Sequence, residues 1–371
     1  MATVKVSYHV FKDYRLDVAA GTDEEKLAIL SQRKTAKAKR DLYSFVSMGF
    51  HGARRKLFLG ATNRAGDILV EFDVDTRKFR SCGFAKSGLC GPNDAKIHKG
   101  VWVNEAQDAV YFGIATLSPL PQTVESRGGT LVRYDIAKGR FSRVANPTPG
   151  DYHQATAWDL RRGKVYMFTD RGGFAVYDLR RKKTLRYESM ESAPHQSCID
   201  DAGGVWGTYG AGRQSLYRYN PDKNAFEFPG TTFPNAVAAA GVMYPGAGPI
   251  DSIINGGDGY LYTGTALGDF YRLDPRNGEL KYLGKPFPDK RLPGLAIGQD
   301  GWLYLSGGRE RASMLARYSR EEERFEYLGN VEHKDGTYLH YVHELVVVDG
   351  VVYIGETDNP TRSGYLWVCE V

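Results

Sequence analysis

Residues 109–113 read AVYFG, a short apolar and aromatic segment whose pattern recurs along the chain. The other copies share an apolar residue followed by an aromatic one, and they are KLFLG at 56–60, KVYMF at 164–168, GVWGT at 204–208, YLYTG at 260–264, WLYLS at 302–306 and VVYIG at 351–355. The seven aromatic residues recur with a mean period of about 49 residues, close to the length of a four-stranded β-propeller blade. The repeat therefore predicts seven blades.

A second pattern follows most copies of the repeat and indicates the outer half of each blade. It consists of a large apolar residue, then Asp or a similar polar residue, then another large apolar residue six positions later. Its members are Phe72-Asp73 with Phe79, Tyr134-Asp135 with Phe141, Tyr219-Asn220 with Phe226, Leu273-Asp274 with Leu280, and Tyr318-Ser319 with Phe325. The polar side chain stabilises a tight turn between two strands. Each blade is thus expected to hold four antiparallel strands.

The two ends of the chain are expected to complete the ring. Residues 364–371, GYLWVCEV, can form the third strand of blade seven, and no later segment supplies a fourth. Residues 4–11, VKVSYHVF, close the ring as that missing strand, which removes an open sheet edge. Thr22 and Glu25 form a capping box that predicts one surface helix over about 22–40. We expect the whole chain, 1–371, to be a single all-β, seven-bladed propeller domain.

Composition and charge narrow the classes of partner. The chain has 43 Gly and 16 Pro and is 12% aromatic, which is typical of a turn-rich β protein. Its 49 Lys and Arg against 44 Asp and Glu leave a net charge of +5, too small and too evenly spread to favour nucleic acid or a membrane surface as partner. A small or single-chain partner and a monomeric protein are therefore expected.

The N-terminal sequence and the cysteines bear on location. The start, MATVKVSYHVFKDYRLD, lacks the zones of a signal peptide, and no run approaches the roughly 20 apolar residues of a membrane span. The four cysteines show no CxxC pair, which is typical of a protein in a reducing compartment. The expected location is cytoplasmic as the sequence stands, or secreted or periplasmic if a signal was trimmed.

Histidine recurs at one repeat position, the start of the first strand of a blade. In a propeller this strand lines the central channel, so side chains from different blades converge there. The residues at this position are His98, His153, His195 and His343 in blades two, three, four and seven, and Asp251 in blade five. The remaining blades lack His, so the architecture does not demand it, and we expect a shared site. Three further residues at the ends of second strands on the same rim are expected to bind substrate: Arg171, Tyr209 and Arg213.

Two kinds of chemistry fit neutral histidines beside arginines. In the first, an arginine neutralises a substrate carboxylate, His or Tyr removes the proton from the adjacent carbon, and a second such group protonates the leaving oxygen. This is β-elimination on a uronic acid sugar. In the second, three or four imidazoles bind a divalent metal ion, with Ca, Mn or Zn as candidates. Ligands from separate blades leave no signature in sequence spacing, so both remain open.

At these residues the chain resembles the seven-bladed propeller polysaccharide lyases, including ulvan lyases and rhamnose–glucuronate lyases. The likeness covers the repeat architecture throughout and, in motif, blades two to four, with KIHKG at 96–100 and VYFG at 110–113. The resemblance implies that His98 is a catalytic histidine, that His153 or Tyr152 transfers a proton, and that Arg171 binds the substrate carboxylate. The family's second blade-two histidine is replaced by IATL at 114–117, and His195 is the candidate for its place.

These patterns together predict a polysaccharide or oligosaccharide lyase that cleaves a uronic-acid-containing glycan by β-elimination on the channel rim. Asp251 and His343 are expected to contact the substrate, and no cofactor is required by this mechanism. The alternatives are a metal-dependent propeller lyase or hydrolase, and a non-catalytic sugar-binding or interaction scaffold. A scaffold would lack a buried polar cluster, so the histidine set argues against it.

Overall fold

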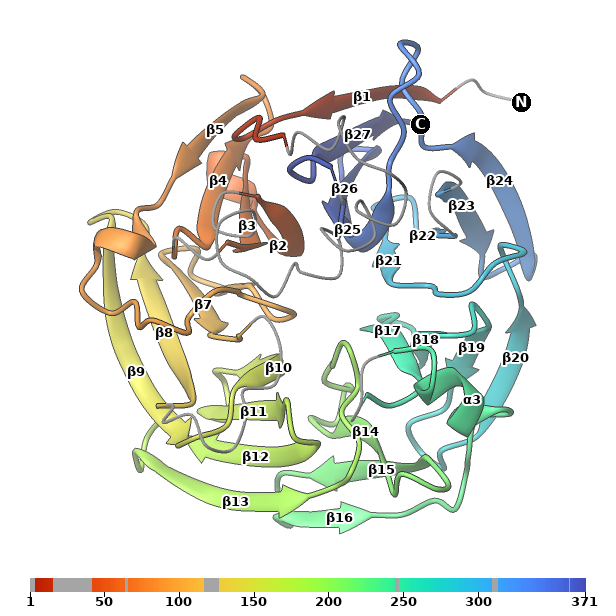
Figure 1. Ribbon diagram of the computed structural model, residues 1–371. Coiled ribbons are helices and arrows are strands. Elements are labelled where there is room, and N and C mark those ends of the chain that lie inside the picture. The colour runs from red at the N-terminus through yellow and green to blue at the C-terminus, as the bar shows by residue number, and fades with distance from the viewer. Residues whose placement is uncertain are drawn as a thin grey trace, which may run out of the picture.

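A computed structural model describes residues 4–15, 42–63, 66–116, 127–243, 247–308, 313–359 and 361–371. These residues form seven antiparallel sheets arranged as blades around a central channel (Figure 1). Six of the sheets in this part of the chain have four strands, and the sheet of blade four has three. The predicted seven-bladed, all-β propeller is confirmed.

The N-terminal strand closes the ring as predicted. β1 (Lys5–His9) pairs antiparallel with β27 (Leu366–Glu370), from Lys5↔Glu370 to His9↔Leu366. The sheet order of this blade is β1-β27-β26-β25, so the first strand of the chain occupies its outermost place (Figure 1). This pairing removes the edge that β27 would otherwise expose. The surface helix predicted over about 22–40 lies outside the described residues.

In blades one to six the strands run from the channel to the perimeter in chain order, and in blade seven β1 takes the outermost place after β25, β26 and β27. Blades one to three comprise β2 (Ser44–His51), β3 (Lys56–Thr62), β4 (Leu69–Asp73), β5 (Lys78–Ser81), β6 (Trp102–Val103), β7 (Ala109–Gly113), β8 (Gly129–Asp135), β9 (Arg140–Thr148), β10 (His153–Asp159), β11 (Lys164–Thr169), β12 (Gly173–Asp178) and β13 (Lys183–Ser189). Blades four to seven comprise β14 (Val205–Tyr209), β15 (Ser215–Asn220), β16 (Ala225–Glu227), β17 (Ile250–Asn255), β18 (Leu261–Thr265), β19 (Phe270–Leu273), β20 (Leu280–Gly284), β21 (Gly294–Ile297), β22 (Leu303–Gly307), β23 (Met314–Ser319), β24 (Arg324–Asn330), β25 (Tyr341–Val348) and β26 (Val351–Thr357).

Within the described residues, helical structure is confined to short connections. The helical segments are η2 (Gly52–Arg54), η3 (Phe84–Lys86) and α3 (Ala236–Ala240). No helix in the described part of the chain is long and apolar enough to cross a membrane.

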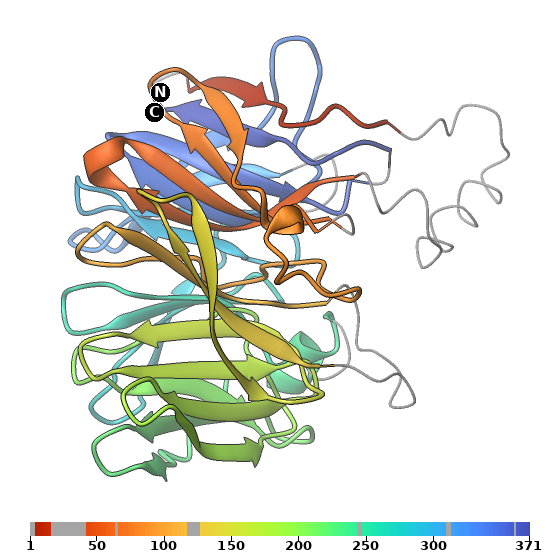
Figure 2. The same ribbon diagram turned by 90° about the vertical axis from the view of Figure 1, so that its left-hand side faces the viewer.

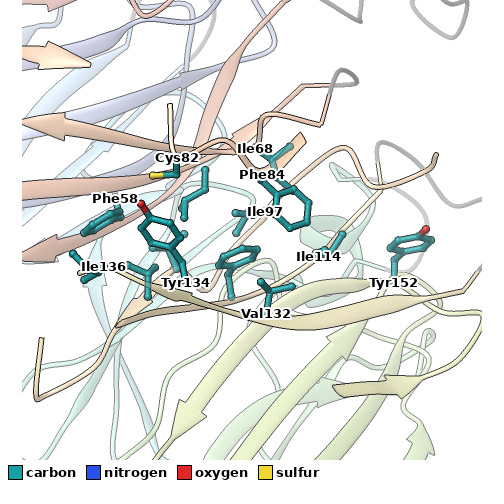
Figure 3. Packing of buried hydrophobic residues seen from close by; sticks show 14 residues of the cluster. Phe58, Ile68, Cys82, Phe84, Ile97, Ile114, Val132, Tyr134, Ile136 and Tyr152 are labelled. Atoms are coloured by element: carbon teal, nitrogen blue, oxygen red, sulfur yellow. The ribbon is translucent and has the colours of Figure 1, made fainter. Parts of the chain in front are cut away.

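The repeated aromatic residue explains why the blades pack. It lies in the second strand of its blade, and Phe58, Tyr166 and Trp206 are at most 1% exposed. Phe58 belongs to a buried cluster that joins blades one and two and includes Phe112 and Tyr134 (Figure 3). Large aromatic side chains remove much apolar area from water, so this repeat stabilises the contact between neighbouring blades.

Strand direction gives the ring two distinct faces (Figure 2). The antiparallel pairing of β2 with β3, Ser44↔Thr62 to His51↔Lys56, places the start of a first strand beside the end of the second. Blade four departs from this pattern, because in the described structure its innermost segment pairs with β14 through a single isolated bridge, Ile199↔Val205. The starts of the first strands therefore surround one mouth of the channel, and their ends surround the other.

Candidate functional site

Three of the predicted channel histidines meet at the mouth where the first strands begin. The ring centroids of His98 and His195 lie 4.5 Å apart, those of His98 and His343 4.8 Å, and those of His195 and His343 4.7 Å. Each side chain is buried, with at most 5% exposed. They come from blades two, four and seven, so only the closure of the ring brings them together.

An irregularity in the innermost strand of blade seven helps to aim His343 into the channel. The pairing of β25 with β26 shifts register between Val342 and Glu344. Such bulges place two successive side chains where a regular strand would alternate them between its faces. Both His343 and Glu344 are consequently buried at the channel.

Hydrogen bonding fixes the orientation of His98. Its Nδ1 lies 2.7 Å from the backbone oxygen of Gln154, and its Nε2 lies 3.0 Å from Nε2 of His343. A carbonyl oxygen only accepts, so Nδ1 of His98 carries the proton and donates it. The neutral imidazole of His98 therefore presents a lone pair on Nε2.

A buried carboxylate orients His195 in a similar way. Asp251 is fully buried, and its Oδ1 lies 3.1 Å from Nδ1 of His195. Arg291 donates to the same carboxylate from Nε at 3.0 Å and from Nη2 at 2.7 Å. Burial acts to raise the pKa of Asp251, but Arg291 and His195 outweigh burial and hold this pKa well below its ordinary value. The ionised carboxylate favours the proton on Nδ1 of His195 and leaves a lone pair on Nε2.

All three imidazoles are neutral at pH 7. Burial lowers the pKa of His195 to about 4, against the opposing effect of Asp251. Burial, with the positive charge of Lys96 and Lys99, also lowers the pKa of His98 and His343 well below the ordinary value. Neutral imidazole is the form that binds metal ions.

The three histidines form a candidate metal site. Each offers one donor atom, and the three atoms all lie within 4.8 Å of one another. Around a tetrahedral ion with metal–nitrogen distances near 2.1 Å, the donors lie roughly 3.4 Å apart, so modest rotation of the rings would close this set on an ion. Metal-binding histidines commonly donate their second ring N–H to a carbonyl or carboxylate oxygen. The Gln154 carbonyl has this position at His98, and the Asp251 carboxylate has it at His195.

The cluster forms part of a pocket of about 350 Å³, here called the histidine pocket. Its lining combines charged, polar and apolar side chains from several blades and comprises Leu42, Tyr43, Ser44, Val46, Thr62, Lys96, His98, His195, Val242, Met243, Arg291, His343, Thr357, Asp358 and Asn359. Lys96 and Arg291 bring positive charge beside the imidazoles. The site is therefore suited to an anionic ligand such as a carboxylate.

His153 occupies the same repeat position but a different environment. Its Nε2 lies 3.0 Å from Oγ1 of Thr148, and a Cβ atom added to Gly113 or Gly129 would lie 2.7 Å from atoms of its ring. The ring therefore fills space left by two glycines of blade two. Burial lowers the pKa of His153 to about 3. The structure does not bring His153 together with the other three histidines.

Tyr152 also lies away from the histidine pocket. It is 3% exposed at the edge of the apolar cluster between blades one and two (Figure 3). Its hydroxyl donates to Oδ1 of Asp94 at 3.3 Å, and Asp94 forms an ion pair with Arg127. The proton-transfer role implied by the resemblance stays a prediction for Tyr152 and His153.

The predicted substrate-binding residues divide into two groups. Asp251 and His343 belong to the cluster described above. Arg171 and Arg213 are exposed, whereas Tyr209 is half-buried and packs edge-on against Phe228 at 4.9 Å. Arg171, Tyr209 and Arg213 are absent from the described lining of the histidine pocket, so their roles stay predictions.

Sequence reasoning missed the two cations of the pocket. Lys96 stands two residues before His98 within KIHKG, and its proximity to that histidine was an available signal. Arg291 lies in an irregular segment outside the repeat and adopts a left-handed φ of 72°, which is rare for a residue other than glycine. No pattern in the sequence pairs Arg291 with Asp251.

Comparisons with known proteins support the fold. No family model and no curated protein matches this sequence. Among solved structures, a catalytically inactive histidine-to-alanine variant of virginiamycin B lyase from Staphylococcus aureus, with quinupristin, is similar at 11% identity and a TM-score of 0.62, with 99% of each chain covered. A streptogramin B lyase is similar at 12% identity and a TM-score of 0.61, covering 99% of this chain and 97% of that one. At these identities the likeness shows a shared propeller fold.

Proposed function

We propose that this protein is a lyase that removes an oxygen leaving group from a carboxylated substrate held in the histidine pocket. A glycan containing uronic acid is the proposed substrate class. The observation that carries the proposal is the cluster of His98, His195 and His343 beside Lys96 and Arg291 in one pocket. The two similar solved structures are named as lyases, and one is described as inactive when a histidine is replaced by alanine.

A divalent transition-metal ion is part of this proposal, which favours the metal-dependent alternative over the metal-free one. Three nitrogen donors suit Zn²⁺ or Mn²⁺ better than Ca²⁺, which prefers oxygen ligands. A bound ion would polarise an oxygen of the substrate carboxylate and so acidify the adjacent C–H.

The residues of the chain supply binding and proton transfer. We assign Arg291, held in place by Asp251, to attract the substrate carboxylate. Lys96 lies outside the ligand set. A metal ion bound beside it would favour the neutral amine over the ammonium, and we assign Nζ in that neutral form to take the proton from the carbon next to that carboxylate. The electron pair of the C–H bond forms a C=C bond as the neighbouring C–O bond breaks, and Lys96 returns the proton to the leaving oxygen.

The reaction is tested by incubating metal-loaded protein with glucuronate-containing polysaccharides and their oligosaccharides. Elimination creates a double bond conjugated to the carboxylate, so ultraviolet absorbance should rise as the chain is cleaved. A saturated product with a new reducing end would show hydrolysis instead, and no cleavage of any such substrate would contradict the proposed substrate class.

Two variants of Lys96 separate charge from proton transfer. Lys96→Arg keeps a positive charge but cannot release a proton near neutral pH, and Lys96→Met removes both properties. If Lys96 transfers the proton, both variants should lower kcat by a factor on the order of 10² or more. If it only anchors the carboxylate, Lys96→Arg should retain most activity.

Arg171→Ala separates the two candidate anchors for the carboxylate. The family resemblance predicts that this change raises KM and lowers kcat, whereas assignment of the carboxylate to Arg291 predicts near-wild-type kinetics. Arg171 is exposed, so its replacement by Ala is expected to leave the fold intact.

A further inference from the structure

Gln154 lies at a break in the pairing of the innermost strand of blade three. The pairing of β10 with β11 shifts register between His153 and Ala155, which leaves Gln154 as the extra residue of a β-bulge. Its backbone oxygen is turned toward blade two, where it lies 2.7 Å from Nδ1 of His98 and accepts from the backbone N–H of Lys99 at 3.4 Å. The position of this bulge therefore decides how firmly the ring of His98 is held.

Asp170, which follows β11, holds the bulge through two contacts. Its backbone N–H donates to the backbone oxygen of Tyr152 at 2.9 Å, and its Oδ1 accepts a hydrogen bond from Nε2 of Gln154. Asp170 and Gln154 are 6% and 5% exposed, so both side chains are shielded from water. Asp170 is thus connected to the ring of His98 through a single intervening residue.

The second polar atom of the Gln154 side chain lacks a partner. Its Oε1 is buried and accepts no hydrogen bond in the described structure, although buried polar side-chain atoms are nearly always hydrogen-bonded. An ionised carboxylate has no proton to donate, whereas a protonated carboxyl group has one O–H. A proton on Asp170 would therefore satisfy Oε1 of Gln154, while the other carboxyl oxygen continues to accept from Nε2.

The charges that face Asp170 are compatible with such a proton. Burial raises the pKa of Asp170 from 3.8 to about 7, and the neighbouring carboxyl of Asp151 acts in the same direction. Lys96 of blade two and Arg171, the next residue in the chain, oppose burial but do not outweigh it. Tyr187 of β13 donates to Oδ2 of Asp151 at 2.7 Å, and burial raises the pKa of this phenol to about 12, so it is neutral at pH 7.

We propose that Asp170 and Gln154 form an acid–amide pair joined by two hydrogen bonds, and that Asp170 is thereby a positioning residue for His98. In the protonated state the carboxyl O–H donates to Oε1 of Gln154, and the other carboxyl oxygen accepts from Nε2. Loss of the proton breaks the first bond and leaves two acceptors beside each other, which loosens the bulge and its carbonyl. His98 is therefore held most firmly below about pH 7. Its role as a metal ligand rests on the proposed function, whereas the acid–amide pair does not.

Two variants of Asp170 test the pair at matched charge. Asp170→Asn keeps one donor and one acceptor at every pH, and Asp170→Leu removes both at a similar size. The probe is the exchange of the Nδ1 proton of His98 with water in the metal-free full chain, followed by NMR with ¹⁵N-labelled histidine. The signal is identified by its absence in His98→Ala, and faster exchange indicates a looser bond to the Gln154 carbonyl.

The exchange rate of the wild type is compared with that of Asp170→Asn at several pH values. Their ratio should be close to 1 at pH 5 and rise to roughly fivefold by pH 9, the effect of losing one hydrogen bond. Base catalysis of exchange acts on both proteins alike and cancels in the ratio. Asp170→Leu should exchange at least fivefold faster than Asp170→Asn throughout. A ratio that stays constant from pH 5 to 9 would overturn the proposal, even if Asp170→Leu did not fold.

Co²⁺ titration extends the test to the metal centre. Asp170→Leu should bind Co²⁺ at least fivefold more weakly than Asp170→Asn, because both are uncharged and differ in the bonds to Gln154. Equal affinity of the two variants would refute the positioning role while leaving the metal centre in place. A wild type that binds no Co²⁺ would instead refute the proposed metal centre, and the exchange ratio would still decide whether the acid–amide pair exists.

Discussion

His153 and His195 occupy the same position in the repeat, yet their surroundings differ. Burial lowers the pKa of both, to about 3 and about 4 respectively. The ring of His153 fits against Gly113 and Gly129 of the neighbouring blade, so it fills a gap between blades. His195 instead faces two other imidazoles and is backed by Asp251. Burial and a lowered pKa are thus shared by a packing residue and a candidate ligand, and convergence with other donors distinguishes them.

The largest effect should follow removal of one imidazole from the centre. His98→Ala is expected to weaken Zn²⁺ or Mn²⁺ binding by at least 10³-fold, because the site loses one of three protein ligands. Elimination activity should fall with metal content. Metal titration followed by dialysis and elemental analysis measures the effect, with His153→Ala as the matched control. If His98→Ala and His153→Ala lost metal equally, the histidine cluster would not differ from His153 in metal binding.

The next largest effect concerns folding stability on the packing side. His153→Ala should lower the free energy of unfolding by about 2–3 kcal/mol, because it leaves a cavity beside Gly113 and Gly129. Gly129→Ala should also destabilise the protein, since its new Cβ would lie 2.7 Å from the His153 ring. Urea denaturation of both single variants and the double variant completes the test. Additive losses in the double variant would show that ring and glycine are not coupled.

A smaller change should follow loss of the carboxylate behind His195. Asp251→Asn is expected to weaken metal binding by roughly 10- to 100-fold, because the amide no longer favours the proton on Nδ1 of His195. Competition with a chelator of known affinity measures this constant, and the Co²⁺ absorption spectrum reports whether the ligand geometry changes. If the affinity and the spectrum are unaltered, Asp251 pairs with Arg291 but does not influence metal binding by His195.

A gradual pH dependence of folding stability is expected at Asp170, which lies between the two regions. Asp170 follows β11 and accepts a hydrogen bond from Gln154, whose backbone oxygen holds His98. Burial raises the pKa of Asp170 from 3.8 to about 7. The unfolded chain loses this proton first, so stability is fully present below pH 3.8 and is lost as pH rises toward 7.

Asp170→Asn removes that titration. The stability of the wild type relative to this variant should fall by up to about 1.4 kcal/mol per pH unit between roughly pH 4 and 7, then stay level. Urea denaturation at four pH values gives the difference. A constant difference from pH 4 to 8 would show that Asp170 has an ordinary pKa in the folded protein.

Most of the fold could be predicted from the repeat, because the strands and turns of each blade are specified by local sequence. The period of Phe58, Tyr111 and the later aromatic residues predicted seven blades, and the lack of a final strand predicted that residues 4–11 close the ring. The candidate site was only partly accessible to this reasoning. Repeat position placed His98, His195 and His343 at one mouth, but the same counting included His153, whose direction depends on packing against another blade.

The contacts that organise the site depend on segments far apart in sequence. Arg291 reaches Asp251 from an irregular connection with no repeat partner, 40 positions away. The bulge between Val342 and Glu344, which lets successive residues reach the channel, likewise follows from pairing with β26. Such features arise from tertiary closure of the ring, and no local pattern specifies them.

Anomalous X-ray diffraction from crystals loaded with Zn²⁺ shows whether the three imidazoles form a metal site. We expect one strong peak in the channel, with Nε2 of His98, His195 and His343 each about 2.0–2.1 Å from it. His153 should show no metal in the same map. The absence of a peak among the three imidazoles at saturating Zn²⁺, or a peak only at other residues, would show that these histidines do not form a metal site.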